Sequence, residues 1–137
     1  MEDVRVSTEL ADVDVDLLCE WLAEAYWSRT RTRETIERSL AGSLCFSAHA
    51  EGRMVGFARV VTDSATFAWL CDVYVAPECR GRGVGVRLVS EVMDHPDLQT
   101  VRWMLGTRDA HSLYERFGFA TSTEPDRWMT KGFASRF

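Results

Sequence analysis

The spacing of apolar residues divides the chain into short segments with strand or helix character. Residues 4–6 alternate between apolar and polar, which predicts a short first strand. From Asp14 onward the apolar residues recur at helical spacing, and nearby aspartates suit the N-terminus of a helix. Thr32 is placed to cap a second helix, which we expect to run to Leu40 and to end at Gly42.

The middle of the chain contains three β-prone segments. Residues 44–50 and 54–62 flank a short turn that contains Gly52, and this pattern predicts a hairpin. Residues 67–75 are almost entirely apolar, as expected for a strand that is buried on both faces. Asp72 is the one charged residue inside that segment.

Helix and strand patterns alternate in the second half of the chain. A segment that begins at Val84 has one apolar stripe at helical spacing, and Pro96 stops it. Residues 101–105 alternate as in a strand. Residues 110–117 have the spacing of a last helix, which we expect to end at Gly118.

The C-terminal segment is expected to form one more strand, which includes Trp128, Met129 and Phe133. The predicted order is therefore β-α-α-β-β-β-α-β-α-β, with no internal repeat and no linker. Such an order is typical of an α/β fold of the α+β type, in which a mixed sheet carries helices on both sides.

Composition and charge narrow the class of protein. The chain has 137 residues, of which 46% are hydrophobic and 27% charged, as in an ordinary globular protein. At about 150 residues per domain, residues 1–137 are expected to form a single domain. The formal net charge of -5 argues against a nucleic-acid partner, because binding to phosphates needs a basic face.

Cysteine spacing and hydropathy bear on the compartment. The four cysteines lack the short paired spacing of a zinc site and are too few for a disulfide scaffold. We therefore expect reduced thiols and no bound metal. The N-terminal segment does not resemble a signal peptide, and no window approaches the roughly 20 apolar residues of a membrane span. These features predict a cytoplasmic protein with no membrane partner.

The segment most informative about chemistry joins residues 67–75 to the following helix. Gly81, Gly83 and Gly85 allow the main chain to approach a ligand closely, and the helix N-terminus offers unpaired N–H groups. With a nearby arginine, this arrangement favours a phosphate or pyrophosphate. The same glycines also suit a tight connection with no ligand. Their spacing does not match the dinucleotide-binding pattern, and no phosphate-loop lysine follows them.

Two motifs resemble those of the GNAT superfamily of N-acetyltransferases. Residues 72–88 resemble its motif A, in which Arg or Gln is followed by two residues, Gly, one residue, and Gly or Ala. The matching positions are Arg80, Gly83 and Gly85. Residues 107–119 resemble its motif B, in which a tyrosine, here Tyr114, stands four residues before a Gly-Phe pair. The resemblance implies a mostly antiparallel sheet of about six to seven strands flanked by about four helices.

The resemblance also implies acetyl-CoA as the donor and an amine as the acceptor. Backbone amides at the start of the helix would hold the pyrophosphate; they belong to Gly81, Arg82, Gly83, Val84, Gly85 and Val86. The main chain of Val73 and Val75 would pair with the pantetheine amides, as an added strand. Thr107 stands where many relatives carry an asparagine that contacts the cofactor.

Acid and base roles are assigned to two residues. Tyr114 is the candidate general acid, because a phenol with a pKa near 10 can give a proton to a leaving thiolate with a pKa of about 8.5. It could instead be a core aromatic residue on the apolar stripe of its helix. Asp72 is a candidate for binding or deprotonating the amine, or it faces the other side and pairs with an arginine.

The acceptor pocket is expected to include aromatic residues after the first helix. Tyr26 and Trp27 could form a wall for an amine, and His111 could reach the site from the last helix. The acceptor is expected to be a small-molecule or peptide amine. Exposed aromatic residues near the C-terminus could join a homodimer. The alternatives are a coenzyme A-binding module without catalysis and an unrelated anion-binding α/β protein.

Overall fold

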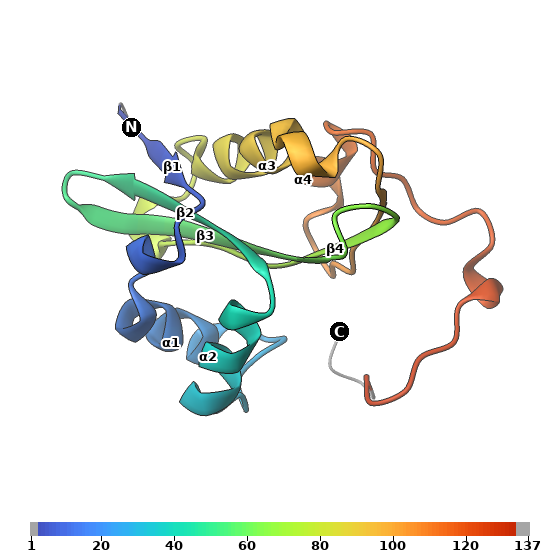
Figure 1. The fold of residues 1–137 in the computed structure, drawn as a ribbon, viewed down its shortest axis with the longest axis horizontal. Helices are drawn as coiled ribbons and strands as arrows, with labels where there is room; N and C mark the ends of the chain where they lie inside the picture. Colours follow the sequence, from blue (N-terminus) through green and yellow to red (C-terminus); the bar gives the residue numbers. More distant parts are fainter. Residues whose placement is uncertain (1–2, 134–137) are drawn as a thin grey trace.

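One mixed sheet lies between two layers of helix in the computed structural model, which describes residues 3–133 (Figure 1). The strands are β1 (Arg5–Ser7), β2 (Leu44–Ala50), β3 (Arg53–Thr62), β4 (Phe67–Val75) and β5 (Arg102–Met104). The helices are α1 (Val15–Glu24), α2 (Arg33–Ala41), α3 (Val84–Asp94) and α4 (His111–Glu115). Short 3₁₀ helices lie at Leu10–Asp12, Pro77–Cys79, Pro96–Leu98 and Pro125–Arg127.

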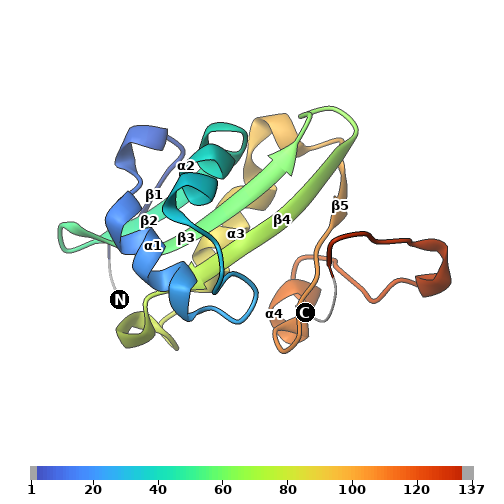
Figure 2. The same ribbon diagram turned by 90° about the horizontal axis from the view of Figure 1, so that it is seen from below.

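The strands follow one another across the sheet in the order of the chain. Among the described residues the order is β1-β2-β3-β4-β5, and the first four strands are antiparallel to their neighbours. β5 is parallel to β4, because α3 carries the chain back across the sheet between them. Helices α1 and α2 cover one face of the sheet, and α3 and α4 lie on the other (Figures 1 and 2).

Local signals in the sequence account for the boundaries of several elements. The Asp14 carboxylate accepts a hydrogen bond from the backbone N–H of Leu17 and caps α1. The Thr32 hydroxyl does the same for α2, which confirms the predicted cap. Between β2 and β3, Glu51 and Gly52 both have positive φ, of 54° and 79°, as a tight two-residue hairpin turn requires.

The close approach of α3 to the sheet depends on Gly56 in β3. A Cβ atom at this position would lie 2.8 Å from Leu88 Cδ1 and 3.0 Å from Val84 Cγ1. Any larger residue would therefore push α3 away from the sheet. Both of these α3 side chains are almost fully buried. The packing fixes where the N-terminus of α3 lies, and the candidate site is built around that end of the helix.

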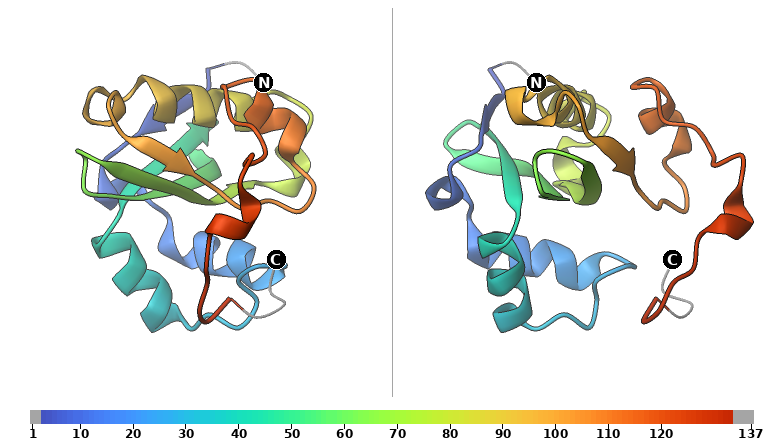
Figure 3. Two further views of the ribbon diagram at one scale, coloured as in Figure 1. Left: turned by 90° about the vertical axis from the view of Figure 1, so that its right-hand side faces the viewer. Right: turned by 45° about the vertical axis from the view of Figure 1, so that its right-hand side comes forward.

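The expected C-terminal strand is wrong for residues 119–133. The sheet formed by residues 3–133 has five strands, rather than the six to seven implied by the resemblance. After α4 the chain leaves the sheet edge as an open arc (Figure 3). No described strand pairs with this segment, in which Pro125 lacks a backbone N–H and the side chains of Trp128 and Met129 are 54% and 95% exposed.

The last helix is also shorter than its apolar spacing predicts. α4 covers His111–Glu115, and turns continue the chain to Gly118, which has a φ of 90°.

None of the helices formed by the described residues combines the length and the apolar character that crossing a membrane requires.

Candidate active site

The site begins where β4 and β5 separate. The two parallel strands pair only at one end, with Phe67 opposite Arg102 and Trp69 opposite Met104. β4 continues to Val75, whereas β5 has ended, so this part of β4 has no strand on its β5 side among the described residues. A cavity of about 150 Å³ lies against the open part of β4.

Six of the residues singled out for chemistry by the sequence line this cavity. They come from the α1–α2 connection, from β4, and from the chain that leads from β5 into α4. These residues are Tyr26, Trp27, Asp72, Val73, Thr107 and Tyr114. The fold therefore gathers residues that are up to 88 positions apart, from 26 to 114, around one space.

The predicted phosphate cradle is the connection from β4 to α3. Gly81 and Gly83 have φ values of 75° and 85°, in the left-handed region that favours glycine. A Cβ at either position would meet no atom within 4 Å, so the space beside this backbone is open. Gly83 precedes α3 without a side-chain cap, which leaves the first-turn amides of residues 84–86 for a ligand. The geometry fits a pyrophosphate group.

The two arginines of this connection are exposed, and one of them has contacts in the protein. Arg80 Nε donates a hydrogen bond to the carbonyl oxygen of Val75 at 3.0 Å, and its guanidinium lies 5.1 Å from the centroid of the Tyr74 ring. The Val75 carbonyl, which was expected to pair with pantetheine, therefore has one lone pair left for a ligand. Arg82 is exposed beside Gly83.

Gly85 differs from Gly81 and Gly83 in its backbone conformation and in its surroundings. A Cβ there would lie 3.7 Å from Val75 Cγ2 and 3.9 Å from Leu113 Cδ2, which are ordinary contacts. Its φ is not in the left-handed region. Its place in the first turn of α3 provides a backbone amide, and the contacts show that α3, α4 and the end of β4 meet there.

Tyr114 lies in α4 at the boundary between two cavities. The residue is 8% exposed and lines both the first cavity and a second one of about 470 Å³. Burial, together with the nearby Tyr26 and Asp109, raises the pKa of the phenol to about 12. In residues 3–133 no buried side-chain oxygen lacks a partner, and the Tyr114 hydroxyl has no hydrogen bond there. The hydroxyl oxygen therefore reaches a cavity rather than the core.

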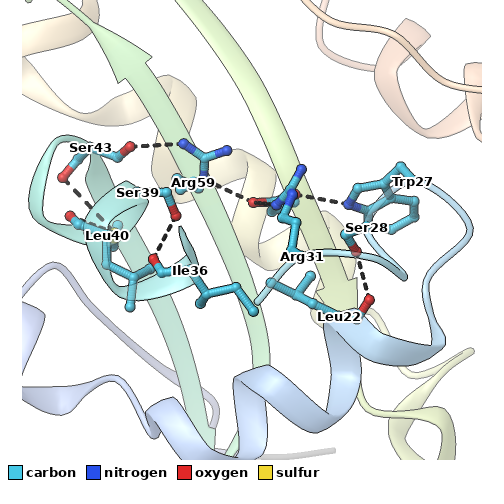
Figure 4. Close-up of polar contacts among 11 residues, drawn as sticks. Leu22, Trp27, Ser28, Arg31, Ile36, Ser39, Leu40, Ser43 and Arg59 are labelled. Atoms are coloured by element: carbon cyan, nitrogen blue, oxygen red, sulfur yellow. Dashed lines mark hydrogen bonds and ion pairs between the residues drawn. The ribbon is translucent and has the colours of Figure 1, made fainter. Parts of the chain in front are cut away.

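Asp72 is the centre of a buried polar network, and its three donors, Trp27, Arg31 and Arg59, are labelled in Figure 4. Its Oδ2 atom accepts hydrogen bonds from Arg31 Nη1 at 2.7 Å and from Arg59 Nε at 2.8 Å. Its Oδ1 atom accepts a hydrogen bond from Trp27 Nε1 at 2.8 Å. Burial acts to raise the pKa of this carboxyl, but the two guanidinium groups outweigh that effect and hold the pKa below its usual value.

A β-bulge in β4 places Asp72 in this network. Arg59 pairs with Cys71 and Phe57 with Tyr74, so β4 has one residue more than β3 between these two pairs. Asp72 adopts the left-handed conformation, with a φ of 51°. Directly opposite residues lie on one face of a sheet, and the extra residue therefore brings Asp72 to the face that carries Arg59. The contacts support the ion-pair alternative for Asp72; the base role stays a prediction.

The expected aromatic wall spans the cavity. The rings of Tyr26 and Trp27 lie edge to face with centroids 5.0 Å apart. The Tyr26 hydroxyl accepts a hydrogen bond from the backbone N–H of Arg108 at 3.1 Å, and the Arg108 guanidinium lies 3.9 Å from the Tyr26 ring centroid. Tyr26 therefore ties the α1–α2 connection to the chain that precedes α4.

Thr107 and His111 both lie near α4, in different positions. The Thr107 hydroxyl accepts a hydrogen bond from the backbone N–H of Ala110 at 3.1 Å and so stabilises the turn that leads into α4. His111 is the exposed first residue of the helix. It lines the second cavity with Tyr114, and it is not among the residues that line the first.

Among the lining residues that sequence reasoning did not assign to the site, three have charged or aromatic side chains. Arg31 and Trp69 contribute a guanidinium and an indole ring, and Asp109 contributes a carboxylate. The sequence did contain a signal for the ion pair between β3 and β4. Arg59 and Asp72 are charged residues of opposite sign inside two apolar strands, and buried charges are usually paired. Nothing comparable in the sequence marks Arg31, which stands in a polar connection.

The fold and the sequence are similar to those of known acetyltransferases. A crystal structure from Xanthomonas campestris pv. campestris, described as a GNAT-family acetyltransferase, shares 43% identity and a TM-score of 0.92, over 96% of this chain and 94% of that one. A Gibberella zeae protein described as an acetyltransferase is 29% identical, over 82% of this chain and 76% of that protein.

A more distant likeness extends to a structure with bound ligands. N-acetylglutamate synthase from Neisseria gonorrhoeae, complexed with coenzyme A and N-acetyl-glutamate, has a TM-score of 0.70 at 19% identity, over 92% of this chain and 30% of that one. This likeness shows a shared fold alone. Residues 41–121, more than half of the chain, match the acetyltransferase (GNAT) domain family. The chain therefore belongs to the GNAT family of acetyltransferases.

Proposed function

We propose that this protein transfers an acetyl group from acetyl-CoA to a primary amine by direct attack within a ternary complex. The observation that carries the proposal is the gap between β4 and β5, with the open glycine connection at one end and Tyr114 beside it. A thioester held by the glycine connection and by the free side of β4 would bring its sulfur toward α4. The complex of the Neisseria gonorrhoeae protein with coenzyme A supports this choice of donor.

Three groups of atoms in this chain would hold the donor. The first-turn amides of α3 would bind the pyrophosphate, and exposed Arg80 and Arg82 would add positive charge nearby. The backbone of Val73 and Val75 would bind the pantetheine arm on the side of β4 that lacks a strand. The donor supplies an acetyl group that is activated as a thioester.

Tyr114 acts as the general acid in the transfer step. The neutral amine nitrogen attacks the carbonyl carbon and forms the new C–N bond, and the C–S bond breaks with its electron pair going to sulfur. The Tyr114 hydroxyl gives its proton to that sulfur, the nitrogen releases its proton to water, and the Tyr114 phenolate then regains a proton from water. The raised pKa of Tyr114, about 12, keeps the phenol protonated at neutral pH, so that its hydroxyl can donate a hydrogen bond to the leaving sulfur.

Asp72 positions the acceptor wall and does not remove the proton from the amine. Its low pKa makes the carboxylate a weak base, and three hydrogen bonds occupy it. One of these bonds fixes the indole of Trp27 against the cavity. The direct mechanism needs no nucleophilic thiol, and burial raises the pKa of the Cys71 thiol to about 12, where it is unreactive.

A thiol-release assay with the full chain tests the proposal. Acetyl-CoA is incubated with a panel of primary amines, and the appearance of both free thiol and N-acetylated product, detected by mass spectrometry, is expected. Calorimetric titration with coenzyme A is the parallel binding measurement. Tight binding without product from any amine would support the non-catalytic coenzyme A module instead. No preference for acetyl-CoA over inorganic phosphate would favour the unrelated anion-binding protein.

A further inference from the structure

Arg31 places a guanidinium group in the wall of the first cavity. The residue lies in the connection between α1 and α2, and its side chain is 25% exposed. One of its Nη1 hydrogens is donated to Asp72 Oδ2 at 2.7 Å, which holds the side chain in place. A guanidinium has five N–H donors in a fixed plane, so the hydrogen bond to Asp72 leaves N–H groups of this cavity-lining side chain for a ligand.

The network around Asp72 has more positive than negative charge. Arg31 and Arg59 share a single carboxylate oxygen, and the indole N–H of Trp27 uses the other. The Arg59 side chain is 9% exposed, also donates a hydrogen bond to the Ser43 hydroxyl, and does not line the cavity. Two guanidinium groups thus share one carboxylate, which leaves one positive charge without a counter-charge in the network. Arg31 is the one of the two arginines that lines the cavity, so this charge is available to a ligand there. A partly desolvated charge of this kind favours an anionic partner.

Other lining residues restrict what that partner is. The surplus is one unit of charge, which matches a carboxylate better than a doubly charged phosphate. Tyr26, Trp27 and Trp69 provide apolar flanks. Asp109 lines the same cavity and forms no ion pair with any other described residue, so its carboxylate suits an ammonium group. A volume of about 150 Å³ is that of a cavity that takes a small molecule the size of benzene.

We propose that the acetyl acceptor is a small amino acid whose carboxylate is bound by Arg31. This inference rests on the proposed acetyl transfer and names the class of its acceptor. Arg31 is then a specificity-determining residue: its in-plane N–H groups bind the carboxylate, and Asp72 holds the guanidinium at the correct angle. The amine of the same molecule lies toward Asp109 and Tyr114.

The test compares acceptors that differ only in the carboxyl group. Small amino acids, their carboxamides and the corresponding decarboxylated amines are assayed for thiol release with acetyl-CoA and the full chain. We expect kcat/KM for the acids to exceed that for the carboxamides by about tenfold or more, because a built polar site discriminates against a partner that lacks the charge. The amine of a carboxamide loses its proton more easily, so amine basicity alone would give the opposite order.

Variants of Arg31 test whether this residue causes the preference for acids over carboxamides. Arg31→Gln should lower the ratio of acid to carboxamide kcat/KM by roughly tenfold, and Arg31→Lys should restore part of it. Arg33→Gln is the matched control, since this exposed arginine pairs with Asp16 and does not line the cavity. Its ratio should equal that of the unmodified protein. The melting temperature of each variant is measured to report any loss of folding.

The possible failures are distinguishable. If no amine of any class is acetylated, the proposed function fails and this inference fails with it. If amines are acetylated but the carboxamides or decarboxylated amines react as well as the acids, acetyl transfer stands and the amino-acid acceptor is overturned. An acid preference that Arg31→Gln leaves intact while the protein stays folded also overturns the role of Arg31.

Discussion

Asp72 and Arg59 form a buried ion pair between β4 and β3, with 2.8 Å between Oδ2 and Nε. Their side chains are 2% and 9% exposed. Asp72 lines the first cavity and Arg59 does not, and Arg59 holds in place the carboxylate that accepts hydrogen bonds from Trp27 and Arg31. Stability and the shape of the first cavity therefore depend on the same two charges.

Removing the negative charge of this pair should destabilise the fold. Asp72→Asn retains the side-chain shape, and Asn tolerates the left-handed backbone at this position, so the change isolates the charge. We expect the free energy of unfolding to fall by about 3 kcal/mol or more, because Arg59 is left buried without its counter-charge. Urea unfolding followed by tryptophan fluorescence measures this loss.

An exposed ion pair provides the matched control. Asp16→Asn removes the carboxylate that pairs with Arg33, where the side chains are 83% and 54% exposed. This substitution should lower the free energy of unfolding by no more than about 1 kcal/mol. If Asp16→Asn and Asp72→Asn lowered the free energy of unfolding equally, the buried pair would be no more important for stability than the exposed pair.

The stability of the protein should depend on pH through Asp72. Its pKa in the folded protein is lowered: burial acts to raise it, but Arg59 and Arg31 have the larger combined effect. Its contribution to stability is therefore complete above the unfolded pKa of about 3.9 and is lost as pH falls through the lower folded value. The difference in unfolding free energy between the unmodified protein and Asp72→Asn should be constant from about pH 5 to 8 and shrink below about pH 4. A difference that does not shrink in acid contradicts this account.

Tyr114→Phe should slow acetyl transfer without preventing donor binding. The substitution keeps the ring, which lies 6.0 Å from that of Phe119, and removes the hydroxyl. We expect kcat to fall by roughly 10²-fold, with the Kd for coenzyme A nearly unchanged. Because the pKa of the phenol is raised to about 12, deprotonation of Tyr114 should not lower kcat of the unmodified enzyme up to about pH 10. Steady-state rates across pH provide the measurement. If kcat of Tyr114→Phe equals that of the unmodified protein, Tyr114 has a structural role only.

Gly83→Ala should weaken donor binding beyond its effect on folding. Gly52→Ala is a suitable control, since both glycines have positive φ and open space where a Cβ would stand, and Gly52 lies in the distant β2–β3 turn. Both substitutions should cost about 1 to 2 kcal/mol of stability. Only Gly83→Ala should raise the Kd for coenzyme A, by about tenfold or more, in calorimetric titrations. Equal affinities for the two variants would contradict the phosphate cradle.

Cys71→Ala should leave acetyl transfer largely intact. Cys71 lines the first cavity, but burial raises the pKa of its thiol to about 12, and the nearby Arg59 does not offset that effect. At neutral pH the group is a thiol rather than a nucleophilic thiolate. We expect kcat within about threefold of the unmodified protein. Mass spectrometry after incubation with acetyl-CoA alone should show no acetyl group on Cys71, and a stable adduct there would replace direct attack with a two-step mechanism.

Much of the fold could be predicted because the signals that define it are local. The caps at Asp14 and Thr32 and the turn at Gly52 lie next to the elements they bound. The C-terminal strand could not be judged in this way, since a strand needs a partner and apolar residues such as Trp128 do not say whether one is present. In the described part of the chain no partner strand lies beside them.

The site was only partly predictable, for a similar reason. The glycine connection and Tyr114 belong to contiguous motifs, and the position of Trp27 after the first helix pointed to the cavity. The partners of Asp72 depend on the register of β4 against β3, and simple alternation along the strand does not reveal an extra residue. Arg31 reaches the same carboxylate from 41 residues away.

The bulge at Asp72 makes the number of residues in β4 as important as their identity. Before it, Leu70 is opposite Val60; after it, Tyr74 is opposite Phe57. Removing one residue between Leu70 and Tyr74 would restore a regular ladder, and β4 would lose the extra residue that brings Asp72 to the face that carries Arg59. Chimeras that import an acceptor pocket from another acetyltransferase must therefore conserve the length of this interval as well as Asp72 itself.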